Sequence, residues 1–166
     1  MHQDLQNPLA PITTVLGVHH TASAEETEAF GKALAKQIQA DATLPRFVAL
    51  YGDLGVGKTA LVRGFSSLLA PLSRVKSPTF ALVNEYRGDP LSVFHFDMYR
   101  ITDEDELFSI GFYDYLDRPG VCLVEWSENI PFALPDRYLR IEIVKSDPLA
   151  SPDRRQITVT LVEATK

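Results

Sequence analysis

Residues 50–61, LYGDLGVGKTAL, decide the fold of this chain. They satisfy the pattern G-x-x-x-x-G-K-[ST], with Gly52, Gly57, Lys58 and Thr59 at the required spacing. Glycines let successive backbone N–H groups turn inward and form a concave anion site, to which the following helix adds the positive end of its dipole. The lysine of this pattern reaches the terminal phosphates, and the hydroxyl binds Mg²⁺. The stretch therefore predicts a phosphate-binding loop.

The segments on both sides of this loop have the patterns that such a loop needs. Residues 46–51 (RFVALY) form a short apolar run that suits a strand buried on both faces. Residues 61–69 carry a helical apolar stripe, which Pro71 ends. A glycine-rich turn that only caps a helix would not need both this strand and this helix. We therefore predict a nucleoside triphosphate site between them.

Two acidic residues stand where a metal-binding carboxylate is expected. Asp97 follows the apolar run at 93–96, and Glu125 follows the apolar run at 121–124. Ligands of α/β sheets bind beyond the carboxyl ends of the strands, so both acids can converge beside Thr59. Each could instead be an exposed acid at the end of a strand, and the sequence alone leaves that alternative open.

The rest of the chain predicts an α/β protein with a single main domain. Ser23 and Glu26 resemble a capping box that opens a helix reaching about residue 40, and an acidic first turn predicts a short helix at 102–110. The further expected strands are 12–18, 79–86, 91–97, 121–124, 138–144 and 156–162. We expect a three-layer P-loop NTPase-like fold, with a mixed sheet flanked by helices. Its expected divisions are a leader and first strand at 1–18 and one P-loop domain at 19–166.

Composition excludes several broad classes of protein. The formal net charge of −6 over 166 residues argues against charge-driven adhesion to DNA or to an anionic membrane. Cys122 is the only cysteine, so no internal disulfide can form, and no run of 18 apolar residues suggests a membrane span. The first residues lack the basic and apolar regions of a signal peptide. We expect a soluble, cytoplasmic protein.

Five blocks of sequence, in this order, resemble the bacterial TsaE family. They are YGDLGVGKTALVRGF, VKSPTFALVNEY, FHFDMYRI, ELFSIGFYDYL and CLVEW, and the resemblance covers about residues 20–145. Members of that family are small P-loop ATPases required for the threonylcarbamoyl modification of adenosine 37 in tRNAs that read ANN codons. Any one block apart from the P-loop would be weak, whereas five in order are specific.

The resemblance implies roles for individual residues. Those expected to contact ATP are Gly52, Asp53, Leu54, Gly55, Val56, Gly57, Lys58, Thr59 and Trp126. Thr59, Asp97 and Glu125 would hold Mg²⁺, and Glu125 would also serve the attacking water. Lys58, Glu125 and Thr79 would be the catalytic residues, with Thr79 in a switch-like segment, Ser77-Pro78-Thr79, near the γ-phosphate.

The resemblance also implies partners. Family members act beside the TsaB–TsaD heterodimer, and ATP hydrolysis drives or resets that assembly, so contact with tRNA is expected to be indirect. Since the sequence offers no assigned arginine finger, we expect slow turnover by the isolated chain and stimulation when partners complete the site. Ala60 departs from the family, which commonly has a second hydroxyl there. Arg154 or Arg155 could approach the nucleotide from the late hairpin.

Other functions and roles remain as alternatives. A small P-loop kinase would share the loop, but no arginine-rich lid segment is visible. A guanine-nucleotide switch would carry N-K-x-D, which the chain lacks. His95, between two phenylalanines, is more simply a packed core histidine. Residues 108–116 are expected to be mostly core, with a partner contact by Tyr113 or Tyr115 left open.

Overall fold

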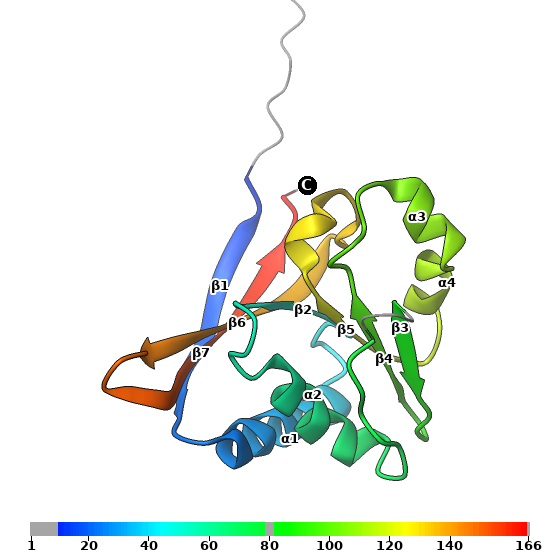
Figure 1. Ribbon diagram of the computed structural model, residues 1–166. Coiled ribbons are helices and arrows are strands. Elements are labelled where there is room, and N and C mark those ends of the chain that lie inside the picture. Colours follow the sequence, from blue (N-terminus) through cyan, green and yellow to red (C-terminus); the bar gives the residue numbers. More distant parts are fainter. Residues whose placement is uncertain (1–9, 79–81, 166) are drawn as a thin grey trace, which may run out of the picture.

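In the computed structural model, which describes residues 10–78 and 82–165, seven strands form one sheet (Figure 1). Their order is β1-β7-β6-β2-β5-β4-β3. The strands are β1 (Ile12–Thr21), β2 (Phe47–Tyr51), β3 (Val83–Tyr86), β4 (Ser92–Asp97), β5 (Gly120–Glu125), β6 (Arg137–Asp147) and β7 (Ser151–Glu163). The helices are α1 (Ala24–Ala40), α2 (Lys58–Leu69), α3 (Glu104–Ser109) and α4 (Phe112–Leu116), with short 3-10 helices η1 (Ser127–Asn129) and η2 (Pro131–Ala133).

The middle of the sheet is parallel and its flanks are antiparallel. Strands β6, β2, β5 and β4 run in one direction, whereas β3 pairs antiparallel with β4, and β7 pairs antiparallel with both β6 and β1. Within the parallel part, Glu125 at the end of β5 is in register with Leu50 on one side and with Asp97 on the other. The P-loop therefore leaves the sheet at the same edge as both acids.

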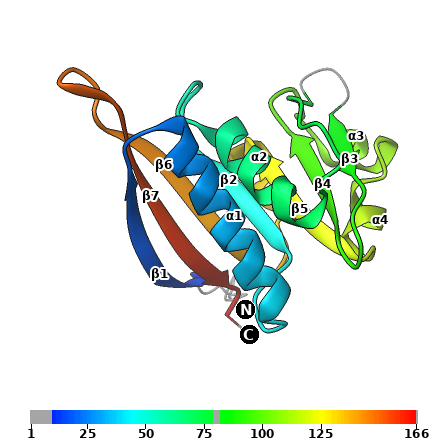
Figure 2. The same ribbon diagram turned by 90° about the horizontal axis from the view of Figure 1, so that it is seen from below.

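Helices cover the parallel strands on both faces, because the strands are apolar on both. On β2, Val48 and Leu50 belong to the core beneath α1 and α2, whereas Phe47 and Ala49 belong to the core beneath α3 and α4. Figure 2 shows α1 and α2 side by side on one face of the sheet. This arrangement confirms the expected three-layer α/β fold with a mixed sheet.

Two glycines allow the backbones of α1 and α2 to touch. A Cβ atom on Gly64 of α2 would lie 1.8 Å from the carbonyl oxygen of Glu28 in α1. A Cβ atom on Gly31 of α1 would lie 2.2 Å from the carbonyl oxygen of Leu61 in α2. Because any larger residue would force the helices apart, this contact fixes how α2, and with it the P-loop, sits on α1.

The structure differs from the expected elements in three places. The strand expected at 12–18 continues to Thr21 and pairs with β7 along its length, so the expected boundary at residue 18 falls inside β1. The helix expected at 102–110 is present as α3, and a second short helix, α4, which the sequence did not predict, follows it after Gly111, whose left-handed conformation (φ 73°) separates the two. Of the strand expected at 79–86, β3 covers Val83–Tyr86, and residues 79–81 lie outside the described part of the chain.

The remaining strand predictions are confirmed. Residues 91–97 hold β4, paired with β3 as a hairpin, and β6 and β7 form the expected late antiparallel pair. Cys122 is buried in the core, and burial raises the pKa of its thiol to about 12. Within residues 10–78 and 82–165, none of the helices has both the length and the apolar character needed to cross a membrane.

Candidate nucleotide-binding site

The P-loop joins β2 to α2 through backbone conformations that favour glycine. Gly52 has a φ of 147°, and a Cβ atom there would lie 2.6 Å from the carbonyl oxygen of Ile143 on β6. Gly57 has a φ of 110° and is the N-cap of α2. Since helix N-termini present unpaired N–H groups and a positive dipole end, the turn before Lys58 is suited to hold an anion.

Lys58 lies buried at the first position of α2 with its ammonium group turned back onto the loop. Its Nζ donates a hydrogen bond to the carbonyl oxygen of Gly52, at 2.7 Å. The same Nζ lies 4.6 Å from the ring centroid of Trp126, which adds a cation–π contact. Both partners are weaker than a phosphate for an ammonium ion, so Lys58 is poised to exchange them for an anionic ligand.

Asp97 and Glu125 end neighbouring parallel strands, and both are buried. Asp97 accepts a hydrogen bond at Oδ1 from the backbone N–H of Tyr99, at 2.9 Å. Glu125 Oε2 lies 2.7 Å from His95 Nε2. Each carboxylate therefore has one oxygen fixed by the protein, which orients the group. The alternative of exposed acids at the strand ends is wrong.

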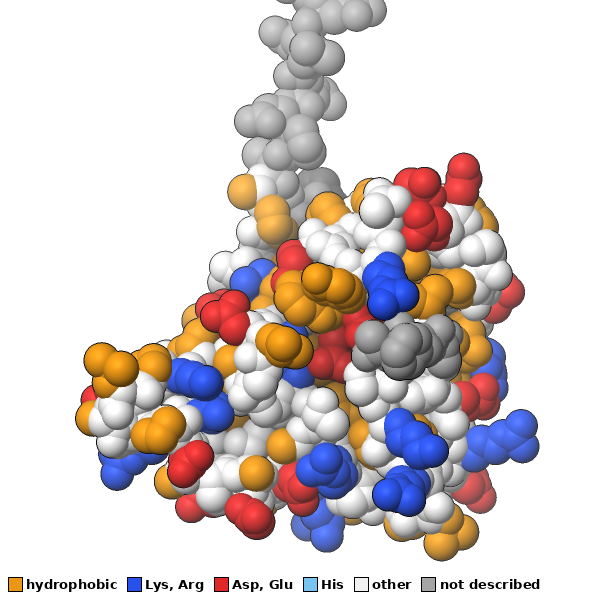
Figure 3. Space-filling model, viewed as in Figure 1, with side chains coloured by type: hydrophobic (Ala, Val, Ile, Leu, Met, Phe, Trp, Pro, Cys, Tyr) orange, Lys and Arg blue, Asp and Glu red, His pale blue; other side chains and the backbone are white. Residues whose placement is uncertain are grey.

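One cavity of about 620 Å³ brings the predicted site residues together. It is lined by Leu54, Gly55, Gly57, Lys58, Thr59, Ser77, Asp97, Tyr99, Glu125 and Trp126. Figure 3 shows acidic side chains in a hollow of this face, with hydrophobic side chains beside them. Of the predicted nucleotide contacts, Gly52, Asp53 and Val56 line the adjoining cavity on the other side of the loop. Thr79 lies outside the described residues.

The oxygen atoms in this cavity fit a magnesium ion. The Thr59 hydroxyl and the carboxylates of Asp97 and Glu125 are hard donors that line the same space. Groups of three or more His, Cys, Asp or Glu side chains that could hold a metal are absent from residues 10–78 and 82–165. These donors thus resemble the magnesium sites of phosphoryl-transfer enzymes, in which the protein supplies only a few ligands and water and substrate supply the others.

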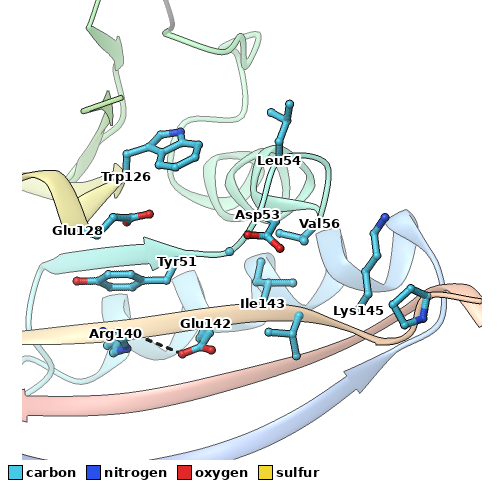
Figure 4. Close-up of a pocket in the computed structure, with 13 residues that line it drawn as sticks. Tyr51, Asp53, Leu54, Val56, Trp126, Glu128, Arg140, Glu142, Ile143 and Lys145 are labelled. Carbon is cyan, nitrogen blue, oxygen red and sulfur yellow. Dashed lines mark hydrogen bonds and ion pairs between the residues drawn. The ribbon is translucent and has the colours of Figure 1, made fainter. Parts of the chain in front are cut away.

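A second cavity, of about 660 Å³, adjoins the first and shares Leu54 and Trp126 with it (Figure 4). The Arg140 guanidinium stacks over the ring of Tyr51 at 3.8 Å and donates to Glu142. Burial raises the pKa of the Tyr51 phenol to about 12. The carboxylates along this cavity are those of Asp53, Glu128 and Glu142. Gly57, Lys58 and Thr59, at the N-terminus of α2, line the first cavity and not this one, so the phosphates of a ligand are better placed in the first cavity.

Trp126 forms the wall between the two cavities. It adopts a left-handed backbone conformation, with a φ of 58°, directly after Glu125. Its ring packs against that of Tyr99, with the centroids 4.9 Å apart. Trp126 therefore lies beside the P-loop lysine, and its expected contact with a nucleotide stays a prediction.

Two site residues were not recognised for their roles from sequence. His95 is fully buried, as expected of a packed histidine, but it also contacts Glu125. A histidine within an apolar strand was the available signal, although the acid that it contacts ends the neighbouring strand β5 and not its own strand. The sequence left open that Arg154 or Arg155 approaches the nucleotide, and Arg155 of β7 donates from Nε to the carbonyl oxygen of Val56 in the P-loop, at 2.7 Å. No local pattern marks that contact, because 99 residues separate the two partners.

Residues 108–116 pack largely as expected. Phe112 is fully buried, and the Tyr115 ring packs edge-on against Phe94 and Phe96. Tyr113 donates from its hydroxyl to Glu104 Oε1, whereas Phe108 is exposed to solvent. The segment therefore builds core around α4.

Comparison with known proteins adds to this geometry. The family described as "Threonylcarbamoyl adenosine biosynthesis protein TsaE" matches residues 21–157. The tRNA threonylcarbamoyladenosine biosynthesis protein TsaE of Bacillus subtilis (strain 168) is 41% identical over 142 residues, 86% of this chain and 84% of that protein. The protein of the same name from Treponema pallidum (strain Nichols) is 31% identical, over 82% of this chain and 95% of its own. A crystal structure of Bacillus subtilis YdiB superimposes with a TM-score of 0.69 at 32% identity, covering 93% of this chain and 88% of that one.

Proposed function

This chain belongs to the TsaE family, and from that membership we propose that it is a magnesium-dependent ATPase required for the threonylcarbamoyl modification of adenosine 37 in tRNA. The observation that carries the proposal is the single cavity that holds Lys58, Thr59, Asp97 and Glu125. A phosphate cradle alone only binds nucleotide, whereas a cradle with two strand-end carboxylates has the groups needed for hydrolysis.

Phosphate binding falls to the P-loop and the first turn of α2. The loop backbone would donate N–H groups to the β- and γ-phosphates, and the helix dipole would add to their attraction. Lys58 would leave the Gly52 carbonyl oxygen and the Trp126 ring and turn to the terminal phosphates. Because the lysine is already buried at the loop, this exchange needs only a rotation of its side chain.

Asp97 and Glu125 would have different roles, one in binding magnesium and the other mainly in orienting the attacking water. Thr59 and Asp97 would hold Mg²⁺, with Glu125 at its outer side, and the ion would neutralise charge on the β- and γ-phosphates. Glu125 would accept a hydrogen bond from the attacking water and orient it toward the γ-phosphate. His95 fixes one oxygen of the Glu125 carboxylate, which suits that task because the other oxygen is then held in one position toward the water.

Hydrolysis by the isolated chain would be slow. Arginine, which stabilises the charge of the transferring phosphoryl group in many P-loop enzymes, does not line the first cavity among residues 10–78 and 82–165. We infer that the TsaB–TsaD heterodimer completes the site and that hydrolysis drives or resets that assembly. The net charge of −6 favours indirect contact with tRNA through these partners.

The test measures phosphate release from ATP and Mg²⁺ by the purified chain, with and without the heterodimer. Lys58→Ala should weaken nucleotide binding at least about tenfold, and Glu125→Gln should keep binding but slow turnover about 100-fold. Lys36→Ala is the matched control, since this lysine of α1 is exposed and lines neither cavity. Reconstituted tRNA modification should fail without this chain and return when it is added.

Three results would count against the proposal. Equal hydrolysis rates with and without the heterodimer would remove the partner role, and unchanged hydrolysis in both site variants would remove the mechanism. Transfer of the γ-phosphate to a small acceptor, in place of phosphate release, would favour the alternative of a small P-loop kinase.

A further inference from the structure

A buried line of polar contacts runs from Glu125 away from the nucleotide cavity. Glu125 Oε2 lies 2.7 Å from His95 Nε2, and His95 Nδ1 lies 3.2 Å from the Tyr86 hydroxyl oxygen. The Tyr86 hydroxyl donates to the carbonyl oxygen of Lys76 at 2.9 Å and accepts from the N–H of Lys76 at 3.1 Å. Side chains from β5, β4 and β3 thus connect the acid to the segment after α2.

Because these contacts are buried, breaking any one of them is costly. The His95 side chain is fully buried, and Tyr86 and Glu125 are nearly so. Water cannot replace a partner in such a place, so breaking one contact leaves a buried polar atom unsatisfied. Both nitrogens of the imidazole are engaged, one toward Glu125 and one toward Tyr86, which fixes the plane of the ring.

The far end of this line returns to the same cavity. Lys76 is held from β3 by Tyr86 and also by Asn84, whose amide Nδ2 donates to the Lys76 carbonyl oxygen at 2.9 Å. Ser77, the next residue, lines the cavity together with Glu125. Two separate walls of the cavity are therefore tied to one buried histidine.

We propose that His95 is a positioning residue that fixes the Glu125 carboxylate relative to the cavity wall at Ser77, through Tyr86 and the backbone of Lys76. It does not touch the nucleotide, since Glu125 lies between it and the cavity. Its effect is on the orientation of Glu125 and hence on turnover, because outer contacts of this kind typically change activity by about 10- to 100-fold. The inference rests on the proposed role of Glu125 in ATP hydrolysis.

The central test is His95→Gln, which keeps a polar side chain of similar reach. Turnover should fall about 10- to 100-fold, while nucleotide affinity stays within about twofold of the parent protein. His20→Gln, an exposed histidine of β1, is the matched control and should change neither quantity. Wild-type turnover in folded His95→Gln, or equal losses in affinity and turnover, would overturn the proposal.

Two further variants separate positioning from a general loss of packing. In Glu125→Gln the carboxylate is gone, so adding His95→Gln should lower turnover little further; additive losses would contradict the proposal. Tyr86→Phe keeps His95 and its contact with Glu125 but removes the link to Lys76, and turnover should fall several-fold with binding unchanged. Unchanged turnover in Tyr86→Phe would overturn the link even if His95→Gln failed to fold.

The same measurements distinguish this inference from the proposed function. If the parent protein does not hydrolyse ATP, or if Glu125→Gln has no effect, the proposed function fails. If Glu125→Gln slows turnover and His95→Gln does not, only the positioning role of His95 fails.

Discussion

Arg155 of β7 reaches the P-loop and donates from Nε to the carbonyl oxygen of Val56, at 2.7 Å. The contact links β7, close to the turn that joins it to β6, to the loop expected to hold phosphates. Holding this carbonyl oxygen fixes the orientation of the Val56 peptide group within the loop. The hairpin is thus part of the support of the loop.

Arg155→Ala should therefore weaken nucleotide binding about tenfold, since a hydrogen bond from a charged donor is lost at the loop. Calorimetric titration with ATP and Mg²⁺ measures the change. Arg154→Ala is the control, because Arg154 is the exposed neighbour on the same strand. Equal affinities of the two variants would show that the contact does not support the loop.

Gly64→Ala should destabilise the protein by about 3 kcal/mol, because its Cβ atom would lie 1.8 Å from the backbone of α1. Urea denaturation with linear extrapolation measures the free energy of unfolding. Ser67→Ala, at an exposed position one turn along α2, should change it by no more than about 0.5 kcal/mol. A stability of Gly64→Ala close to that of Ser67→Ala would contradict the close helix contact.

Trp126 is the only tryptophan, and its ring lies 4.6 Å from Lys58 Nζ. When Lys58 turns to the phosphates of a bound nucleotide, the emission of Trp126 should change, because the charge over its ring has moved. Titration with ATP and Mg²⁺ under steady-state fluorescence measures this change. Glu125→Gln should give the full signal, since it binds without efficient hydrolysis, and Lys58→Met should lose most of it. Identical emission with and without saturating nucleotide would exclude the exchange.

Cys122 should resist alkylation as long as the protein is folded. Burial raises the pKa of its thiol to about 12, so at pH 8 only about one thiol in ten thousand is the reactive thiolate. Mass spectrometry after treatment with iodoacetamide should find no adduct under native conditions and a single adduct in urea. Rapid native labelling would mean that the core around β5 opens readily.

The sequence predicted those parts of the site that depend on short-range pattern. The P-loop needs glycines and a lysine at fixed spacing, and the strand-end acids follow apolar runs, so both could be located without a structure. The layers of the fold could be predicted as well. The continuous apolar run at 46–51 indicates a buried strand, whereas the spacing of apolar residues at 61–69 indicates an amphipathic helix.

What the sequence did not predict depends on distant partners. The roles of His95 and Arg155 require knowledge of which strands are neighbours, and sheet order is not written in any local pattern. The short helix α4 was not predicted, because five residues after Gly111 are too few to show a helical apolar period. The extension of β1 to Thr21 follows from its pairing with β7, which lies far along the chain.

The antiparallel pairing of β1 with β7 places Ile12 opposite Glu163, at the edge of the sheet that lies opposite the P-loop. Tags, surface linkers or fluorophores attached near either end would therefore leave the nucleotide cavity open and facing outward. The same proximity would allow residues 10 and 165 to be joined by a short peptide, so that a circularly permuted chain could begin elsewhere on the surface.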